Sequence, residues 1–308
     1  MPEIRQTSSE LTGEDRRVWL KARLGISRMG HRVVPSLYSL GNPNRISPVF
    51  VTANYKLSFN ALRSQMAGMD CYILVLDTEG INVWCAAGKG TFGTEELVRR
   101  MEATSLKDIV DHRTLILPQL GASGVAAPEV RKRTGFKVEW GPIRASDIPE
   151  YMRTRKTTEE MRRVTFDLKD RMEVIPVEIK NVFAPLVVAT LVLFLLGMRG
   201  TALMILAVAV AGVIAFPILL PFLPTRDFAS KGFLLGVIAS IPFMAGTYSA
   251  NANEAPWVTL ALTLVPALLI APWVAFLALN FTGSTTFTSR TGVRGEIFRY
   301  IPIIEVTF

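Results

Sequence analysis

The sequence predicts a Rossmann-like α/β domain with a mostly parallel sheet, followed by an all-α polytopic domain that crosses a membrane several times. From Pro48 onward, short apolar runs alternate with helical patterns, and this alternation is typical of βαβ units. Charged residues become rare after Asn181, since only 6 of the 34 Lys and Arg residues and 4 of the 26 Asp and Glu residues lie beyond it. The mean hydropathy of +0.33 also indicates a membrane portion.

The expected strands and helices of the α/β domain follow one another closely along the chain. Apolar runs predict strands at 49–52, 72–76, 114–117 and 136–140, and helical patterns separate them at 58–67, 94–101 and 128–134. Thr94 with Glu95 and Glu96 predicts an N-cap followed by first-turn acids. We assign residues 41–156 to this domain and residues 1–40 to an N-terminal extension with an amphipathic helix near 14–24.

Four apolar stretches without charged residues predict four membrane-spanning helices. They cover 182–198, 201–223, 232–250 and 256–281, close to the roughly 20 residues that a span requires. We assign 157–181 to a charged helical linker, 182–281 to the transmembrane domain and 282–308 to a basic C-terminal tail. The sequence shows no fifth span, which would place the tail on the other side of the bilayer. The absence of charges within the spans favours an anchor over an ion pathway.

The basic residues predict a multi-pass protein of the inner (cytoplasmic) membrane, with its first domain in the cytoplasm. Residues 1–6 have no apolar core, so we expect no cleavable signal peptide. With four spans, Arg226 and Lys231 lie on the cytoplasmic side together with the basic tail, as the positive-inside rule requires. Arg199 is the exception to that rule.

One cysteine stands in an unusual local setting. Cys85 belongs to the octapeptide Asn82-Val83-Trp84-Cys85-Ala86-Ala87-Gly88-Lys89, which follows an apolar run and the turn signal at 77–80. Its sulfur is therefore expected at the carboxyl end of a strand, the edge at which open α/β sheets bind ligands. The small residues Ala86, Ala87 and Gly88 would let a flat, bulky partner approach the backbone. The alternative is that Cys85 is a small buried hydrophobe, as free cysteines commonly are.

This octapeptide resembles the cap-helix motif of the corrinoid protein of the bacterial mercury-methylation pair, which is similar in turn to the large subunit of the corrinoid iron–sulfur protein. The resemblance runs from about residue 40 to the end of the chain and includes 47–56, 74–80, 90–96, 117–124 and 280–283. It implies a cobalamin-type corrinoid whose cobalt takes the Cys85 thiolate as its lower axial ligand. It also implies methyl transfer to inorganic Hg(II), which would make the protein a corrinoid-dependent methyltransferase of anaerobic one-carbon metabolism. A thiolate donates electrons strongly, and binding to a metal cation deprotonates a thiol.

The resemblance places the corrinoid contacts in the octapeptide and in two segments that follow it. On residue type alone, the loop at 118–124 could equally be an ordinary turn between a strand and a helix, and Lys89 could equally be a solvated lysine. Asn82 is placed to cap the helix that carries Cys85, and Trp84 to pack that helix against the domain. The full set is Asn82, Val83, Trp84, Cys85, Ala86, Ala87, Gly88, Lys89, Thr91, Gln119, Gly121, Ser123 and Gly124.

The histidines, the number of cysteines and the basic clusters argue against three other kinds of site. Neither His31 nor His112 lies in the Asp-x-His-x-x-Gly arrangement of histidine-ligated cobalamin sites. Two cysteines are too few for a disulfide framework or for a protein-borne iron–sulfur cluster. Cys71 opens an apolar strand and is expected in the core. The net charge of +8 does not indicate nucleic-acid binding, because the basic clusters at 131–133 and 153–156 lack interleaved aromatic residues.

The expected partners also follow from the resemblance. They are a ferredoxin-like protein with [4Fe–4S] clusters as electron donor, and a separate folate-type methyltransferase as methyl source. Two alternatives stay open. One is a methyl-carrier corrinoid protein of one-carbon (acetyl-CoA pathway) metabolism, and the other is a non-enzymatic, membrane-anchored binding domain in which Cys85 is structural. A corrinoid spectrum of the purified protein would exclude the non-enzymatic binding domain. Methylmercury formation would distinguish mercury methylation from the methyl-carrier function.

Overall fold

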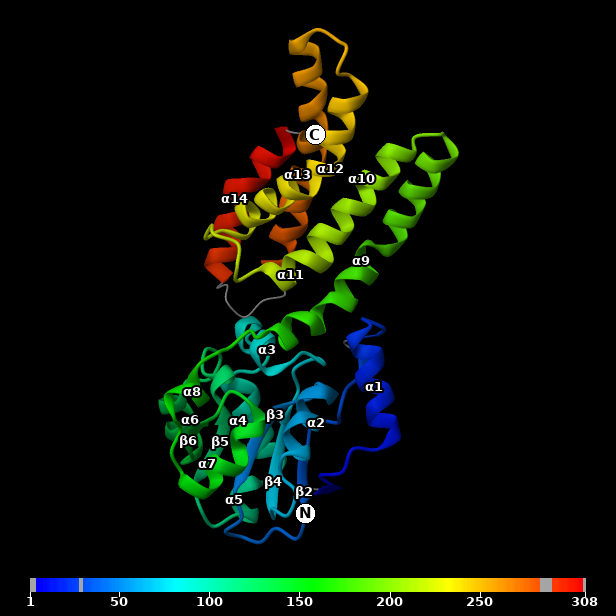
Figure 1. Cartoon of the computed structure of the whole chain (residues 1–308). Helices are drawn as coiled ribbons and strands as arrows, with labels where there is room; N and C mark the ends of the chain where they lie inside the picture. Colours follow the sequence, from blue (N-terminus) through cyan, green and yellow to red (C-terminus); the bar gives the residue numbers. More distant parts are fainter. Residues whose placement is uncertain (1–3, 28–29, 283–289, 307–308) are drawn as a thin grey trace. The chain divides into compact units, whose positions relative to one another are not determined.

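The computed structural model describes residues 4–27, 30–282 and 290–306, and the chain forms two compact units (Figure 1). The first unit is Met1–Val164 and the second is Thr165–Phe308. Within the described residues, the strands belong to the first unit, and the second unit is helical.

A six-stranded mixed sheet organises the first unit, with the strand order β1-β2-β4-β3-β5-β6. The strands β4, β3, β5 and β6 run parallel to one another, which confirms the expected mostly parallel sheet, and β2 runs antiparallel to β4. The sequence pattern did not predict β1 and β2, which lie within 1–40 and extend one edge of the sheet. The strands are β1 (Arg5–Thr7), β2 (Leu37–Leu40), β3 (Val49–Ala53), β4 (Cys71–Leu76), β5 (Thr114–Pro118) and β6 (Lys137–Gly141).

Helices cover both faces of this sheet, which explains why all six residues of β4 are buried. One apolar core includes residues of α3, α4 and α6, and the other includes residues of α2 and α7. The helices of this unit are α1 (Gly13–Arg23), α2 (Lys56–Ser64), α3 (Val83–Lys89), α4 (Thr94–Ala103), α5 (Leu106–Ile109), α6 (Ala127–Thr134), α7 (Ile148–Thr154) and α8 (Glu159–Arg162), with short 3-10 turns η2 (Gln119–Gly121) and η3 (Ala145–Asp147).

The strand order reverses between β3 and β5. The chain leaves β3 into α2, on one face of the sheet, and leaves β5 toward α6, on the other face. In open α/β sheets such a reversal is where ligands bind, outside the carboxyl ends of the strands. The segments that follow β3, β4 and β5 all begin at this edge.

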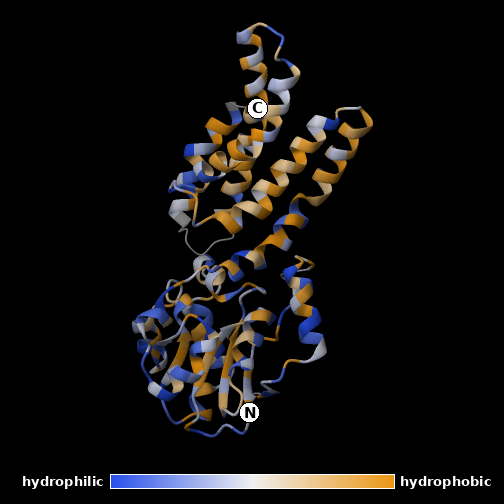
Figure 2. Cartoon of the chain, in the orientation of Figure 1, coloured by the Kyte–Doolittle hydropathy of each residue, from blue (hydrophilic) through white to orange (hydrophobic). Residues whose placement is uncertain are grey.

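The second unit contains four helices that are long and apolar enough to cross a membrane within the described residues, as the sequence predicts. Figure 2 shows that hydrophobic residues predominate along these helices. The first candidate begins at Leu168, so one continuous helix includes much of the segment assigned to the linker. Gly283, which the sequence analysis includes in the segment 280–283, lies outside the described residues. The elements are α9 (Leu168–Leu195), α10 (Arg199–Ala209), the π-helical turn η4 (Val210–Ala215), α11 (Phe216–Leu219), α12 (Phe228–Ala250), α13 (Pro256–Phe281) and α14 (Arg290–Val306).

Small residues let α12 and α13 pack closely. A Cβ atom built on Gly236 would lie 2.5 Å from the Cα of Ala271, and one on Gly232 would lie 2.9 Å from the Cα of Ala275. These glycines are four residues apart, so they lie on one helix face. Such small-residue contacts are typical of helix association in membranes, where burial of apolar side chains gives little driving force.

Candidate functional site

The helix α3 carries Cys85, and six residues separate it from the end of β4. Asn82 is its N-cap, and the Asn82 side-chain oxygen accepts a hydrogen bond from the Cys85 backbone N–H at 2.9 Å. The predicted capping role of Asn82 is therefore confirmed. Gly90 ends the helix with φ at +88°, a left-handed conformation that favours glycine. Both ends of this short helix are thus defined by local sequence.

The two faces of α3 differ in burial. Val83, Ala86 and Ala87 are buried in the core, whereas Cys85 is partly exposed. The methyl groups of Ala86 and Ala87 pack inward, so the prediction that small residues let a flat partner approach the backbone concerns Gly88 most directly. Gly88 is exposed, and a Cβ atom built on it would meet no heavy atom within 4 Å. Since residues three and four apart share a helix face, the outer face of α3 combines Cys85 with Gly88 and Lys89.

Trp84 and Thr91 flank this outer face. Trp84 is partly buried, so it contributes to packing without being enclosed. The Thr91 hydroxyl lies 3.5 Å from the backbone oxygen of Ala86 and donates a long hydrogen bond to it. Thr91 thereby satisfies a carbonyl near the end of α3.

The loop after β5 packs against α3, so the structure brings together the two segments that the sequence analysis singles out. A Cβ atom on Gly124 would lie 3.0 Å from the Cα of Ala87 and 2.2 Å from the backbone oxygen of Phe92. A Cβ atom on Gly121 would lie 2.5 Å from the Phe92 ring. Close packing within the domain therefore accounts for both glycines.

Two polar side chains of this loop differ in their surroundings. Ser123 is exposed. The Gln119 side-chain oxygen is buried and has no hydrogen-bond partner within the described residues. A buried, unsatisfied acceptor is costly, by about 1–3 kcal/mol, and therefore indicates a missing donor.

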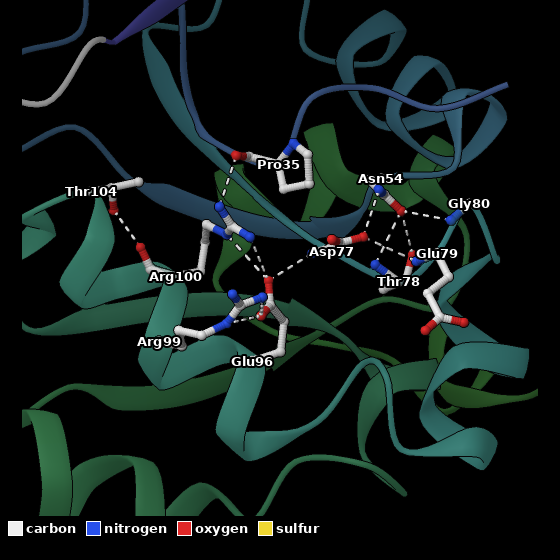
Figure 3. Close-up of polar contacts among 10 residues, drawn as sticks. All are labelled: Pro35, Asn54, Asp77, Thr78, Glu79, Gly80, Glu96, Arg99, Arg100 and Thr104. Carbon is white, nitrogen blue, oxygen red and sulfur yellow. Dashed lines mark hydrogen bonds and ion pairs between the residues drawn. The ribbon is translucent and has the colours of Figure 1, made fainter. Parts of the chain in front are cut away.

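The turn between β4 and α3 is held by Asn54, which follows β3 (Figure 3). The Asn54 side-chain oxygen accepts hydrogen bonds from the backbone N–H groups of Thr78 and Gly80, at 3.1 and 2.9 Å. Its side-chain nitrogen donates to Asp77 at 3.0 Å. Asn54 is only 2% exposed, so this amide ties the carboxyl ends of β3 and β4 together. Asn54 is not among the predicted site residues, although a lone asparagine directly after a strand was a usable signal.

Glu96 of α4 supports the same turn from the other side. Its carboxylate accepts a hydrogen bond from the Asp77 N–H at 2.8 Å and from Arg100 at 2.9 Å, and it also pairs with Arg99 (Figure 3). Arg100 donates in turn to the backbone oxygen of Pro35. The turn that leads from β4 to Cys85 is therefore held by Asn54 on one side and by Glu96 on the other.

The N-cap prediction for α4 requires a correction. Gly93 occupies the N-cap position and Thr94 is the first helical residue. The Thr94 hydroxyl instead accepts a hydrogen bond from the backbone N–H of Ala126 at 2.8 Å. This tertiary contact joins α4 to the segment that follows the loop at 118–124.

The other candidate residues have structural contacts. Cys71 is fully buried, its sulfur lies 3.6 Å from that of Met66, and burial raises the pKa of its thiol to about 12, which confirms its expected place in the core. The His112 ring hydrogen-bonds the backbone oxygen of Ser47, and the His31 ring that of Ile26. The described ranges contain no group of three His, Cys, Asp or Glu side chains arranged to hold a metal ion.

Comparisons with known proteins concern the first unit. Residues 27–152 match the family described as CO dehydrogenase/acetyl-CoA synthase delta subunit. The gamma subunit of the acetyl-CoA decarbonylase/synthase complex of Methanopyrus kandleri is 34% identical over 127 residues, which is 41% of this chain and 27% of that protein. The corresponding subunit of Methanocaldococcus jannaschii is 32% identical over 128 residues, 41% of this chain and 26% of that protein. The α/β domain is similar to these subunits.

The similarity covers only part of this chain and part of each relative. The chain spans about a quarter of the length of these curated relatives, and the matched region ends within α7. The expected relation to acetyl-CoA pathway proteins is thereby confirmed at the level of the domain. The family match, which ends at residue 152, stops before the four candidate membrane helices.

Proposed function

We propose that the first unit binds a corrinoid against the outer face of α3 and that the Cys85 thiolate is the lower axial ligand of its cobalt. The position of Cys85 carries this proposal, because its sulfur lies on the partly exposed face of a capped helix at the carboxyl edge of the sheet. The similarity of residues 27–152 to acetyl-CoA decarbonylase/synthase subunits supports it as well.

The residues around Cys85 fit such a group. Gly88 adds no side chain to the exposed face of α3, so a flat ring system has room to approach. The unsatisfied oxygen of Gln119 requires a donor, and the peripheral amide groups of a corrinoid are hydrogen-bond donors. The exposed hydroxyl of Ser123 offers a further polar contact.

Each of these residues has a task that follows from its contacts. When bound, the corrinoid supplies the metal and the methyl group that it carries. Cys85 would hold that metal through its sulfur, and Asn82 fixes the first turn of α3, which carries Cys85. Lys89 lies one helical turn beyond Cys85, on the same helix face as the proposed contact. Asn54 and Glu96 keep the preceding turn from moving.

The methyl acceptor that we propose is inorganic Hg(II), with methylmercury as product. Hg(II) is an electrophile, and electron donation from a thiolate ligand favours the release of a methyl group toward an electrophile. Support comes from the complete Asn82 to Lys89 motif and from the resemblance that it carries. A ferredoxin-like protein with [4Fe–4S] clusters would supply electrons, and a folate-type methyltransferase would supply the methyl group.

A second candidate is a methyl-carrier function in one-carbon metabolism. The names of the matched relatives, subunits of the acetyl-CoA decarbonylase/synthase complex, favour this candidate. It uses the same corrinoid site and the same cysteine, and it differs only in the methyl acceptor.

We propose that the second unit anchors this site to the inner membrane. The four candidate spans support this, and the basic residues Arg226 and Lys231 favour an α/β domain on the cytoplasmic side. We keep the division into extension, corrinoid domain (41–156), linker (157–181), transmembrane domain (182–281) and tail as part of this proposal.

The decisive experiment compares the wild type with Cys85→Ala and Cys71→Ala, each produced as the full chain together with a [4Fe–4S] partner. We expect Cys85→Ala to reduce the methylmercury yield to background and to shift the corrinoid spectrum, while protein and bound corrinoid persist. Cys71→Ala should keep the activity, because Cys71 is a core residue.

Three outcomes would contradict parts of the proposal. Normal methylation by Cys85→Ala would exclude the thiolate ligand. A wild-type protein with bound corrinoid that transfers methyl groups elsewhere but not to Hg(II) would favour the carrier function. A protein that never retains corrinoid would leave only a non-enzymatic binding domain.

A further inference from the structure

We propose that the outer face of α1 binds the surface of a bilayer that contains anionic lipids. This inference concerns Gly13–Arg23 and the residues up to Ile26, and it does not depend on the proposed corrinoid site.

The inner side of α1 is firmly attached to the domain. Asp15 is buried and pairs with Arg63 of α2 at 2.6 Å, and Asn60 donates a hydrogen bond to it at 3.1 Å. Thr12 and Asp15 form a reciprocal capping box at the start of the helix. Ala22, seven residues further along the helix, is also buried. The orientation of α1 is therefore fixed, and its outer face is a defined surface.

That outer face is unusually apolar for a water-exposed helix. Trp19 and Leu20 are 48% and 53% exposed, and Leu24 and Ile26 are 41% and 46% exposed. These four large apolar side chains within eight residues, two on α1 and two directly after it, make up the apolar patch, and exposed apolar patches mark interaction sites. Tryptophan is the side chain most typical of the water–lipid interface.

Basic residues surround the same patch. Arg16, Arg17 and Lys21 are exposed, and Arg23 lies over the Trp19 ring at 5.6 Å. The acidic side chains of α1 do not offset this charge, because Asp15 pairs with Arg63 and Glu14 lies 3.6 Å from Lys56. A short helix with exposed apolar residues among cations is the pattern of an interfacial membrane helix.

A cavity of about 360 Å³ adjoins this patch, between α1 and α2. Its walls combine apolar groups of Leu11, Trp19 and Leu57 with the cations Arg16 and Arg23, and the lining also includes Asn60, Ser64 and Asp15, whose carboxylate pairs with Arg63. Such a mixture suits an amphiphile with an anionic head, as a phospholipid is.

The chain itself favours a bilayer over a protein as the occupant. The chain continues from the α/β domain into α9, whose charge-free apolar part begins at residue 182, so a charged helical segment tethers this domain close to lipid. Cationic charge beside the apolar patch matches the anionic lipids of a cytoplasmic leaflet.

The test uses the full chain in vesicles of phosphatidylcholine with or without phosphatidylglycerol. A benzophenone-bearing amino acid replaces Leu20 in one sample and Ile46 in the control, because Ile46 is also apolar and 77% exposed but lies before β3, away from α1. After illumination, mass spectrometry measures lipid adducts. We expect adducts at position 20 at least about tenfold above those at position 46, and a several-fold loss without phosphatidylglycerol or in the triple variant Arg16→Gln, Arg17→Gln, Lys21→Gln.

Equal adduct yields at the two positions would overturn the proposal. So would cross-links from position 20 to protein instead of lipid, because they would identify another chain or another segment as the occupant. Adducts that are insensitive to lipid charge and to the triple variant would exclude the electrostatic part of the contact.

Discussion

The two cysteines show how position gives the same side chain different properties. Cys71 lies inside a strand that is covered on both faces, and burial raises the pKa of its thiol, which makes it unreactive. Cys85 lies on a short helix with one open face. Composition alone does not separate them, whereas the elements that carry them do.

Asn54 provides a residue-scale prediction. Asn54→Ala should lower the free energy of unfolding of the first unit by about 2–4 kcal/mol, because it leaves the buried N–H groups of Thr78 and Gly80 without an acceptor. Urea denaturation followed by hydrogen exchange of residues 71–90 measures the effect. Asn42→Ala is the control, since that exposed side chain should change stability by less than about 0.5 kcal/mol. Equal effects of the two variants would show that the network does not hold the turn.

Asp15 gives a prediction about pH. Burial raises the pKa of its carboxyl, but hydrogen bonds from Thr12 and Asn60 and the charge of Arg63 outweigh it and hold the pKa well below the usual 3.8. The carboxylate therefore stabilises the fold fully above about pH 4, and this contribution is lost as the pH falls below the unfolded-state value toward the folded-state value. Asp15→Asn should cost about 3–5 kcal/mol at neutral pH, because it leaves Arg63 buried without a counter-charge.

Acid titration of the unfolding free energy measures this difference. The gap between wild type and Asp15→Asn should be widest above pH 5 and should narrow as the pH falls below about 4. A gap that is constant with pH would contradict the depressed pKa.

At the scale of elements, α3 and the loop after β5 form one packed assembly. The loop's glycines are required by contact with α3 and Phe92, whereas Gly88 is not constrained by any neighbour of its Cβ position. This contrast separates two glycines that packing requires from one whose Cβ position meets no heavy atom within 4 Å.

Gly88→Ala uses that contrast. We expect it to raise stability by about 0.5–1 kcal/mol, because alanine favours a helix over glycine, and to reduce bound corrinoid, because the added methyl group intrudes on the proposed contact face. Thermal unfolding and the cofactor-to-protein ratio are the two measurements. Gly124→Ala is the comparison, and should destabilise the domain by about 1–3 kcal/mol through its clash with Phe92 and Ala87. Unchanged corrinoid content in Gly88→Ala would place the cofactor elsewhere.

At the scale of the whole molecule, the four candidate spans determine the topology. An even number of crossings places both ends of this chain on the same side of the bilayer. Reporter tags fused at the two ends should therefore both resist protease in intact spheroplasts and both be cleaved after lysis. Cleavage of only one tag in intact spheroplasts would require an odd number of spans.

Much of the fold was predictable because it depends on local patterns. The alternation of apolar runs and helices, the four apolar stretches and the cap at Asn82 are each contained in a few neighbouring residues. Strands β1 and β2 were not predictable in this way, because they have three and four residues and gain their stability from pairing with distant segments. The predicted N-cap of α4 was wrong for the same reason, since the Thr94 hydroxyl accepts a hydrogen bond from Ala126 and not from its own helix.

The sequence by itself determined the alternation of strands and helices from residue 49 onward, the number of candidate spans and the cap at Asn82, because hydropathy and capping act over a few residues. Only the tertiary structure decided that Ala86 and Ala87 face the core, that Gly121 and Gly124 serve packing, and that Asn54 holds the turn before Cys85. These outcomes depend on which segments meet at the carboxyl edge of the sheet. The strand order sets which segments meet there. Burial of both sheet faces selects that order, and no single stretch of sequence contains it.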